Sequence, residues 1–200
     1  MNLIAKLNGL VLAGGESRRM GMDKGLLQYH NKPQRLYIYD LLAEFCENVY
    51  VSIRPDQRKE FESGIPYIVD QNKYPGPFNG LMSAYSKDPN KAWLVLACDM
   101  PLVDRDAIIR LVNKRATSQK ATVYKAMDKD FPEPLFAIWE PEGLRAAQDY
   151  LKNGHSCSPL RFLVQSNVEI VNPLSDDILL NVNHTEDYQK VLKKIKEKSE

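Results

Sequence analysis

The sequence of 200 residues has almost no net charge, since 27 basic side chains stand against 26 acidic ones, for a formal charge of +1. A chain without an excess of positive charge has no overall field that draws it to DNA, RNA or an anionic membrane. We therefore expect neither a nucleic acid nor a membrane among its partners. Any anion must be bound by a local cluster of charges.

Cysteines and long apolar runs are also scarce. Cys46, Cys98 and Cys157 lie far apart and form no Cys-x-x-Cys pair, which argues against a disulfide framework and a structural zinc site. The apolar stretch near the N-terminus is too short to span a bilayer, and it leads into a glycine turn rather than a small-residue cleavage site. We expect a soluble, cytoplasmic protein whose length suits a single domain.

Short apolar runs alternate with helix-like segments along the chain. Strands are predicted at residues 8–13, 48–53, 66–70, 92–99, 121–126 and 134–139. The fourth of these contains Trp-Leu-Val-Leu-Ala without any polar alternation, which indicates a central strand buried on both faces. The alternation predicts an α/β fold, in which helices cover both faces of the sheet.

Three helices are predicted from apolar residues at helical spacing. They cover residues 34–46, residues 104–115 with an acidic start, and the C-terminal segment, where Asn183 is the predicted N-cap and Glu186 the third helical position. The apolar stripe of the last helix consists of Tyr188, Val191, Leu192 and Ile195. The proline- and glycine-dense residues 74–80 predict a loop inside the domain.

Two glycines and two cations follow the first predicted strand. Gly14 and Gly15 place bare backbone N–H groups at the carboxyl edge of the sheet, where open α/β folds bind ligands, and Arg19 and Lys24 could neutralise a polyphosphate there. The spacing matches neither G-x-x-x-x-G-K-[ST] nor G-x-G-x-x-G. From the residues alone, a glycine-rich turn with exposed charges is the alternative.

The pattern Leu-x-Gly-Gly-x-Ser-x-Arg-Met-Gly-x-Asp-Lys-x-Leu over residues 12–26 resembles the signature loop of nucleotidyltransferases that act on molybdopterin. More narrowly, it resembles that of the molybdenum cofactor guanylyltransferase family. The resemblance implies a three-layer Rossmann-like nucleotidyltransferase fold with a mostly parallel mixed sheet. It also implies nucleotide contacts from the backbone of Leu12, Ala13 and Gly14 and a phosphate contact from Lys24. The second glycine, Gly15, favours GTP over CTP, because related cytidylyl enzymes tend to carry alanine there.

Acidic residues follow two further strands. Asp99 ends a predicted buried strand, where a carboxylate could bind Mg²⁺ that bridges nucleotide phosphates, although a turn-forming or capping aspartate is an equal alternative. The sequence Cys-Asp-x-Pro around Asp99 resembles the family's magnesium-binding motif, which implies Mg²⁺ as a cofactor. The resemblance likewise implies nucleotide contacts from Asp70 and from Ser52, which stands where the family often has asparagine.

The resemblance extends over nearly the whole chain. Residues 133–141 and 181–187 are similar to the family's strand near the pterin and to its Asn-Val-Asn segment, so Asn181 and Asn183 are candidates for binding the acceptor. Strand-end hydrogen bonding and helix capping are equal alternatives for these two residues. Residues 1–200 are thus interpreted as one nucleotidyltransferase domain, with nucleotide bound by the N-terminal half and acceptor by the C-terminal half.

The implied reaction is the transfer of GMP from GTP to the terminal phosphate of molybdopterin, with release of pyrophosphate and with Arg19, Lys24 and Asp99 as catalytic residues. The resemblance also implies other proteins of molybdenum cofactor biosynthesis, or acceptor proteins, as partners. Three departures from the family pattern, at Ser52, at Phe78-Asn79 and at His184-Thr185, concern the substrate more than the fold. The alternatives are transfer of another nucleotide to molybdopterin, such as CMP, transfer to a sugar or polyol phosphate, or a nucleotide-binding accessory module without turnover.

Overall fold

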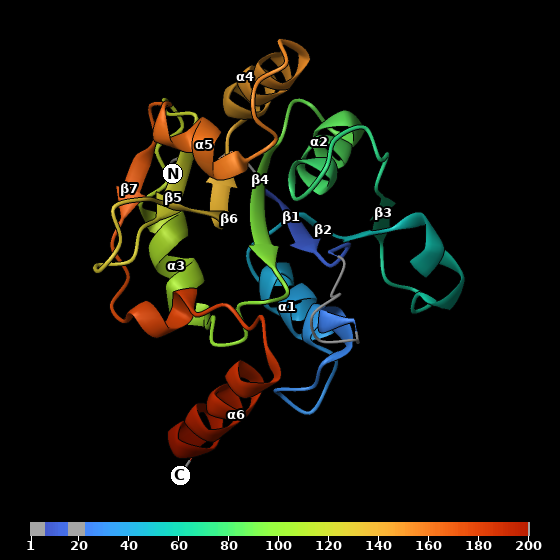
Figure 1. Ribbon diagram of the computed structural model, residues 1–200, viewed down its shortest axis with the longest axis vertical. Coiled ribbons are helices and arrows are strands. Elements are labelled where there is room, and N and C mark those ends of the chain that lie inside the picture. Colours follow the sequence, from blue (N-terminus) through green and yellow to red (C-terminus); the bar gives the residue numbers. More distant parts are fainter. Residues whose placement is uncertain (1–6, 16–22, 200) are drawn as a thin grey trace.

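The computed structural model describes residues 7–15 and 23–199, which form a seven-stranded sheet covered by helices on both faces (Figure 1). The strands are β1 (Leu7–Leu12), β2 (Asn48–Ile53), β3 (Tyr67–Val69), β4 (Ala92–Ala97), β5 (Ala121–Tyr124), β6 (Glu133–Trp139) and β7 (Glu169–Val171). Their order is β3-β2-β1-β4-β6-β5-β7. Strand β6 runs antiparallel to its neighbours β4 and β5, and the other pairs are parallel. The predicted mostly parallel mixed sheet is confirmed.

Helices pack on the two faces of the sheet through two apolar cores. The α-helices are α1 (Gln34–Ala43), α2 (Phe78–Lys87), α3 (Arg105–Asn113), α4 (Pro141–Lys152), α5 (Pro159–Val164) and α6 (Thr185–Ser199), and the 3₁₀ helices are η1 (Lys24–Leu26), η2 (Pro55–Glu60) and η3 (Asp176–Leu179). One core joins the sheet to α1 and α3, and the other joins it to α2, α4 and α5. Every residue of β4 is buried, because alternate side chains enter opposite cores, as the apolar run predicted.

The six predicted strands are all present, with ends that shift by at most two residues. Strand β7 was not predicted, because three residues carry too short an apolar pattern. The prediction of a loop over residues 74–80 is wrong at its end, since Phe78–Gly80 form the first turn of α2. Helices α4 and α5 were not predicted either; each begins with a proline at its first position, where the missing N–H costs no helical hydrogen bond.

The acidic start of α3 is confirmed, because the Asp104 side chain accepts a hydrogen bond from Ala107 N at 2.9 Å. The predicted cap of the last helix is wrong. Helix α6 begins at Thr185, and the Asp187 carboxylate accepts hydrogen bonds from the backbone N–H groups of Asn183 (3.1 Å) and His184 (2.9 Å). Asn183 is thus released for another contact.

Helix α6 extends from one end of the molecule (Figure 1) and is held by its apolar stripe. Val191 is buried, and the remaining predicted stripe residues pack beside it in a third cluster that includes Leu27, Tyr29 and Leu102. This packing brings the segment before α6 next to η1, although the two are far apart in sequence. Among the described helices, none combines the length and apolarity needed to cross a bilayer.

Candidate active site

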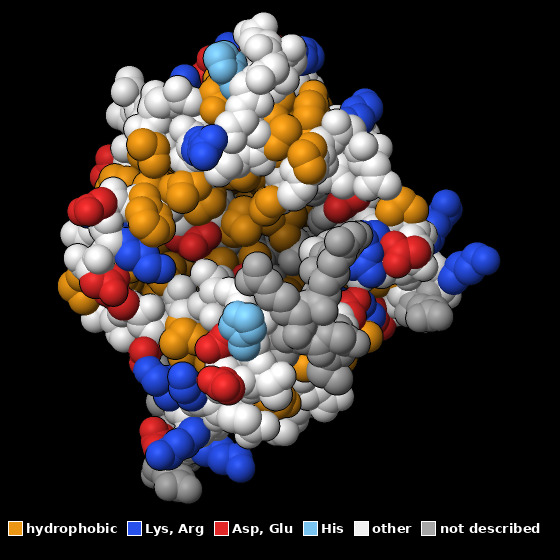
Figure 2. Space-filling view, in the orientation of Figure 1, with side chains coloured by type: hydrophobic (Ala, Val, Ile, Leu, Met, Phe, Trp, Pro, Cys, Tyr) orange, Lys and Arg blue, Asp and Glu red, His pale blue; other side chains and the backbone are white. Residues whose placement is uncertain are grey.

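A cavity of about 760 Å³ lies at the carboxyl ends of β1 to β4. Figure 2, in the orientation of Figure 1, shows this face hollowed near its middle, with hydrophobic side chains gathered above the hollow. All of the residues that the sequence suggested for nucleotide binding line the cavity, namely Leu12, Ala13, Gly14, Gly15, Lys24, Ser52, Asp70 and Asp99. The predicted catalytic residue Arg19 lies outside the described residues.

The topology explains why residues from distant parts of the chain meet here. Gly14 follows β1, Asp70 follows β3 and Asp99 follows β4, and these parallel strands end at the same edge of the sheet. Strand β1 has β2 on one side and β4 on the other, so the chain builds the sheet outward from β1 in both directions. Open α/β sheets form a crevice at such a point.

Lys24 and Asp99 face each other at one end of the cavity. Lys24 Nζ lies 3.9 Å from Asp99 Oδ2 and donates a hydrogen bond of 2.8 Å to Asn183 Oδ1. Asp99 Oδ1 is buried and has no hydrogen-bond partner among the described residues. Burial raises the pKa of Asp99, and the positive charge of Lys24 opposes that rise.

The unpartnered Asp99 oxygen fits a divalent cation, because Mg²⁺ prefers carboxylate oxygens. Within the described part of the chain, no three His, Cys, Asp or Glu side chains lie close enough together to hold a metal ion. A cation at Asp99 would therefore take most of its ligands from substrate phosphates and water, as Mg²⁺ commonly does.

Ser52 and Asp70 form a buried pair in the cavity wall. The Ser52 side chain is 1% exposed, and its hydroxyl donates to Asp70 Oδ1 at 2.5 Å. A Cβ atom on Gly14 would lie 2.7 Å from Asp70 Oδ2, and one on Gly80 would lie 2.6 Å from Ser52 Oγ, so only glycine leaves this pair in place. Burial raises the pKa of Asp70, while the Ser52 hydrogen bond and the charge of Arg54 oppose the rise.

The two residues suggested for acceptor binding flank the Lys24 and Asp99 pair without lining the cavity. Val182, which lies between them, donates its backbone N–H to Asp99 O at 2.7 Å. The Asn181 side chain forms a hydrogen bond with Glu133, whose pKa is raised by burial. The segment 181–183 is thus attached directly to the strand end that carries Asp99.

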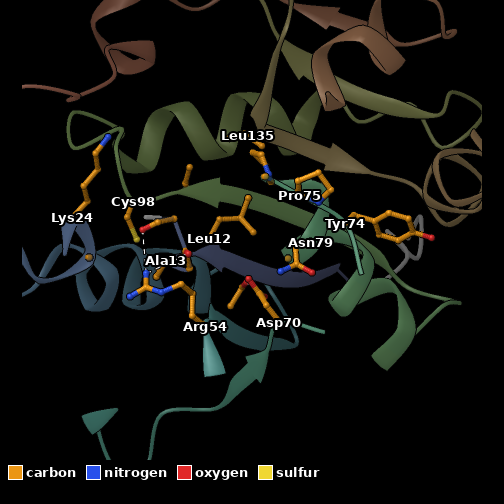
Figure 3. A pocket seen from close by; sticks show the side chains of 18 of the residues that line it. Leu12, Ala13, Lys24, Arg54, Asp70, Tyr74, Pro75, Asn79, Cys98 and Leu135 are labelled. Atoms are coloured by element: carbon orange, nitrogen blue, oxygen red, sulfur yellow. Dashed lines mark hydrogen bonds between the residues drawn. The ribbon is translucent and has the colours of Figure 1, made fainter. Parts of the chain in front are cut away.

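Several lining residues were not identified from the sequence. Arg54 follows β2 and donates to the backbone oxygens of Gly14 (3.4 Å) and Gly15 (3.2 Å), while Tyr74 and Asn79 come from the loop before α2 and from its first turn. Figure 3 shows Lys24 and Tyr74 at opposite sides of the view, with Leu12, Asp70 and Asn79 between them. Arg54 comes directly after a predicted strand, as Asp70 does, and this position alone would have indicated that it lines the cavity.

The cavity also contains a cysteine that is unsuited to nucleophilic chemistry. Cys98 is 4% exposed, and burial raises the pKa of its thiol, so the thiol stays protonated near neutral pH. The arrangement as a whole combines bare glycine backbone, a lysine and a carboxylate with an unpartnered oxygen. It can bind a polyphosphate together with a cation.

Known proteins resemble this chain over most of its length. The family model described as "MobA-like NTP transferase domain" matches residues 9–170. The "Molybdenum cofactor biosynthesis bifunctional protein" of Synechocystis is 35% identical over 186 residues, which cover 92% of this chain and 53% of that protein. The "Molybdenum cofactor guanylyltransferase" of Pasteurella multocida is 29% identical over 185 residues, which cover 91% of this chain and 97% of that protein. The chain therefore spans about half of the Synechocystis protein and nearly all of the Pasteurella protein.

Solved structures share the fold. "Molybdopterin-guanine dinucleotide biosynthesis protein A" from Archaeoglobus fulgidus superposes with a TM-score of 0.77 at 21% identity, covering 96% of this chain and 100% of that one. The "4-diphosphocytidyl-2C-methyl-D-erythritolsynthase" from Anaerococcus prevotii reaches a TM-score of 0.70 at 12% identity, covering 96% and 99%. At these identities the likeness concerns the fold alone.

Proposed function

Because the chain belongs to the family of MobA-like NTP transferase domains, and is thus a nucleotidyltransferase, we propose that it transfers GMP from GTP to the terminal phosphate of molybdopterin. The observation that supports this proposal most directly is the meeting of Lys24, Asp99 and the Gly14-Gly15 backbone in one cavity. The choice of GTP and molybdopterin rests on the relatives named guanylyltransferase, which match this chain over almost their whole length.

The charges of the cavity suggest how GTP is placed. The triphosphate lies at the end formed by Lys24 and Asp99, where a cation and a metal-binding oxygen neutralise its charge. The nucleoside extends over Leu12 and past Asp70 toward Tyr74 and Pro75, the apolar and aromatic side of the cavity (Figure 3). Ser52 acts here through Asp70, because its buried hydroxyl is already bonded to that carboxylate.

We assign Mg²⁺ to Asp99, where the bound ion supplies positive charge to the nucleotide phosphates. Lys24 adds a compact positive charge from the opposite side of the same space. Arg19 remains the second proposed cation of the loop, on sequence grounds. These groups neutralise charge that builds up on the phosphates, which is the main task of the protein in phosphoryl chemistry.

The chemical step needs no general base from the protein. A terminal phosphate monoester has a second pKa of about 6, so its oxygen is largely anionic at neutral pH. That oxygen forms a bond to the α-phosphorus of GTP, the bond from the α-phosphorus to its bridging oxygen breaks, and pyrophosphate leaves with the electron pair. The segment 181–183 lies where it can position the acceptor, since it contacts both Lys24 and Asp99. Other proteins of cofactor biosynthesis are proposed partners that deliver the acceptor.

The proposal is tested by incubating the protein with Mg²⁺, GTP labelled in the α-phosphate, and molybdopterin. We expect the label in a molybdopterin dinucleotide and an equal amount of pyrophosphate, both lost in Lys24→Ala. Pyrophosphate without the dinucleotide would point to another acceptor. Transfer from CTP in preference to GTP would overturn the guanylyl assignment.

A further inference from the structure

The two ends of the glycine-rich loop are attached to the same short segment of the chain. The loop leaves β1 at Ala13–Gly15 and reaches η1 at Asp23, and both ends contact the residues that follow β2. Arg54 and Gln57 make these contacts, from the beginning of η2. The sequence pattern of the loop gave no indication of either residue.

Gln57 uses both atoms of its amide in this arrangement. Its Oε1 accepts a hydrogen bond from Arg54 N at 2.7 Å, while its Nε2 donates to Asp23 Oδ2 at 2.5 Å and to Ala13 O at 3.5 Å. The orientation of the amide is fixed by this chemistry, because a flipped amide would set a donor against a backbone N–H and an acceptor against a carboxylate. One side chain thus connects the start of the loop to its end.

Asp23 transmits this contact to Lys24. Its second oxygen, Oδ1, accepts a hydrogen bond from Gly25 N at 2.8 Å and so caps η1, the single turn that begins with Lys24. Gln57 does not line the cavity, whereas Lys24 does. Any effect of Gln57 on the nucleotide must therefore pass through the residues that it holds.

Arg54 supports the other end of the loop. Its Nη1 donates to Gly15 O at 3.2 Å, and its guanidinium is held by an ion pair with Asp56 whose N–O distance is 3.1 Å. The carbonyl groups of Gly14 and Gly15 are thereby turned toward Arg54. A backbone whose carbonyl groups are occupied in this way is not free to present them to a negatively charged phosphate.

We propose that Gln57 is a positioning residue that sets the distance between the two ends of the glycine-rich loop and thereby places Lys24 for the triphosphate. The proposal rests on the proposed function for the identity of the nucleotide. The position of Lys24 does not depend on that identity, so the two can fail separately.

A charge exchange between Gln57 and Asp23 tests the contact. Gln57→Glu sets two carboxylates against each other, and Asp23→Asn sets two amide donors against each other, so each single variant is expected to weaken GTP·Mg²⁺ binding about tenfold. The double variant restores a donor facing a carboxylate and keeps the caps of Arg54 N and Gly25 N, but it loses the longer hydrogen bond to Ala13 O. We expect its affinity to exceed that of either single variant and to lie about threefold below wild type. Arg58→Ala, an exposed position of the same 3₁₀ helix, is the control and should bind like wild type.

Lys24→Ala separates positioning from a general structural role. If Gln57 acts through Lys24, Gln57→Ala weakens binding about tenfold in the wild-type background and leaves it nearly unchanged when Lys24 is already alanine. Equal losses in both backgrounds would overturn the proposal, as would a double charge-exchange variant no better than the single ones.

Hydrogen exchange of the segment 23–27 without nucleotide gives a result that is independent of the ligand. Gln57→Ala should speed exchange of this segment, because the Asp23 cap of Gly25 N loses its support, while exchange in β4 stays unchanged. Unchanged exchange in the segment would also overturn the proposal. A wild type that binds CTP or ATP better than GTP would contradict the proposed function alone, and the variants would then be compared with that nucleotide.

Discussion

Asp99→Asn is predicted to make the protein more stable and far less active. The Asp99 side chain is only 26% exposed, its Oδ1 has no partner among the described residues, and its pKa is raised although Lys24 Nζ lies 3.9 Å away. The fold therefore disfavours the charged form, since burial outweighs the attraction of the lysine. An amide of the same shape removes the cost of burying a charge, which exceeds the cost of burying a neutral polar group without a partner. We expect a gain of about 1 kcal/mol in the free energy of unfolding.

A gain of that size should raise the melting temperature by about 2–4 °C for a chain of this length. Because the pKa of Asp99 is higher in the folded state, wild type gains stability as the pH falls through that value, and Asp99→Asn should lack this gain. Turnover with GTP and Mg²⁺ should fall at least about a hundredfold, because an amide is a poor substitute for an anionic metal ligand.

The assay compares thermal unfolding over about pH 4 to 8, the range in which a carboxyl group with a raised pKa titrates, with pyrophosphate release at neutral pH. Asp128→Asn, at an exposed position, is the matched control and should change neither quantity. Loss of stability in Asp99→Asn at neutral pH would refute the electrostatic reasoning. Turnover at the wild-type rate would refute the assignment of Asp99 to the metal.

Three further substitutions test close contacts, a buried amide and a buried hydrogen bond. Gly80→Ala places a Cβ atom 2.6 Å from both Leu12 Cδ2 and Ser52 Oγ, so denaturant unfolding should show a free energy of unfolding lower by about 1–3 kcal/mol. An unchanged free energy would mean that these two side chains move aside without cost. Gln34→Leu replaces a fully buried amide that has no partner among the described residues, so it should add about 1–2 kcal/mol by the same measurement, whereas destabilisation would reveal a contact of the amide. Ser52→Ala removes the hydrogen bond that favours ionised Asp70, so the acidic limit of GTP binding should move to higher pH, and an unchanged pH profile would exclude this role.

The strands and most of the cavity were predictable from the sequence because both depend on local patterns. Apolar runs mark buried strands, and a polar residue just after a parallel strand lies at the ligand-binding edge, as do Asp70, directly after β3, and Asp99, two residues after β4. The same rule applies to Arg54, which follows Ile53 at the end of β2. Where a residue follows a strand directly, the sequence therefore indicates its place in the site.

Contacts made across the fold could not be predicted in this way. Gln57 lies in a short 3₁₀ helix without apolar periodicity, and its partner Asp23 is 34 residues away. Asn183 has two predicted roles, helix cap and acceptor contact, and only the first is wrong: Asp187 accepts the hydrogen bonds at the start of α6. Asn183 instead contacts Lys24, 159 residues away. The packing of α6 beside η1 brings Asn183 to Lys24, and no local sequence pattern predicts that packing.

The central claim, that this cavity binds GTP through Lys24 and a cation at Asp99, is tested most directly by equilibrium binding of GTP, CTP, ATP and UTP with and without Mg²⁺. We predict clear preference for GTP, dependence on Mg²⁺, and loss of that dependence in Asp99→Asn. Equal binding of the four nucleotides, or GTP binding that neither Mg²⁺ nor Asp99→Asn alters, would contradict the account.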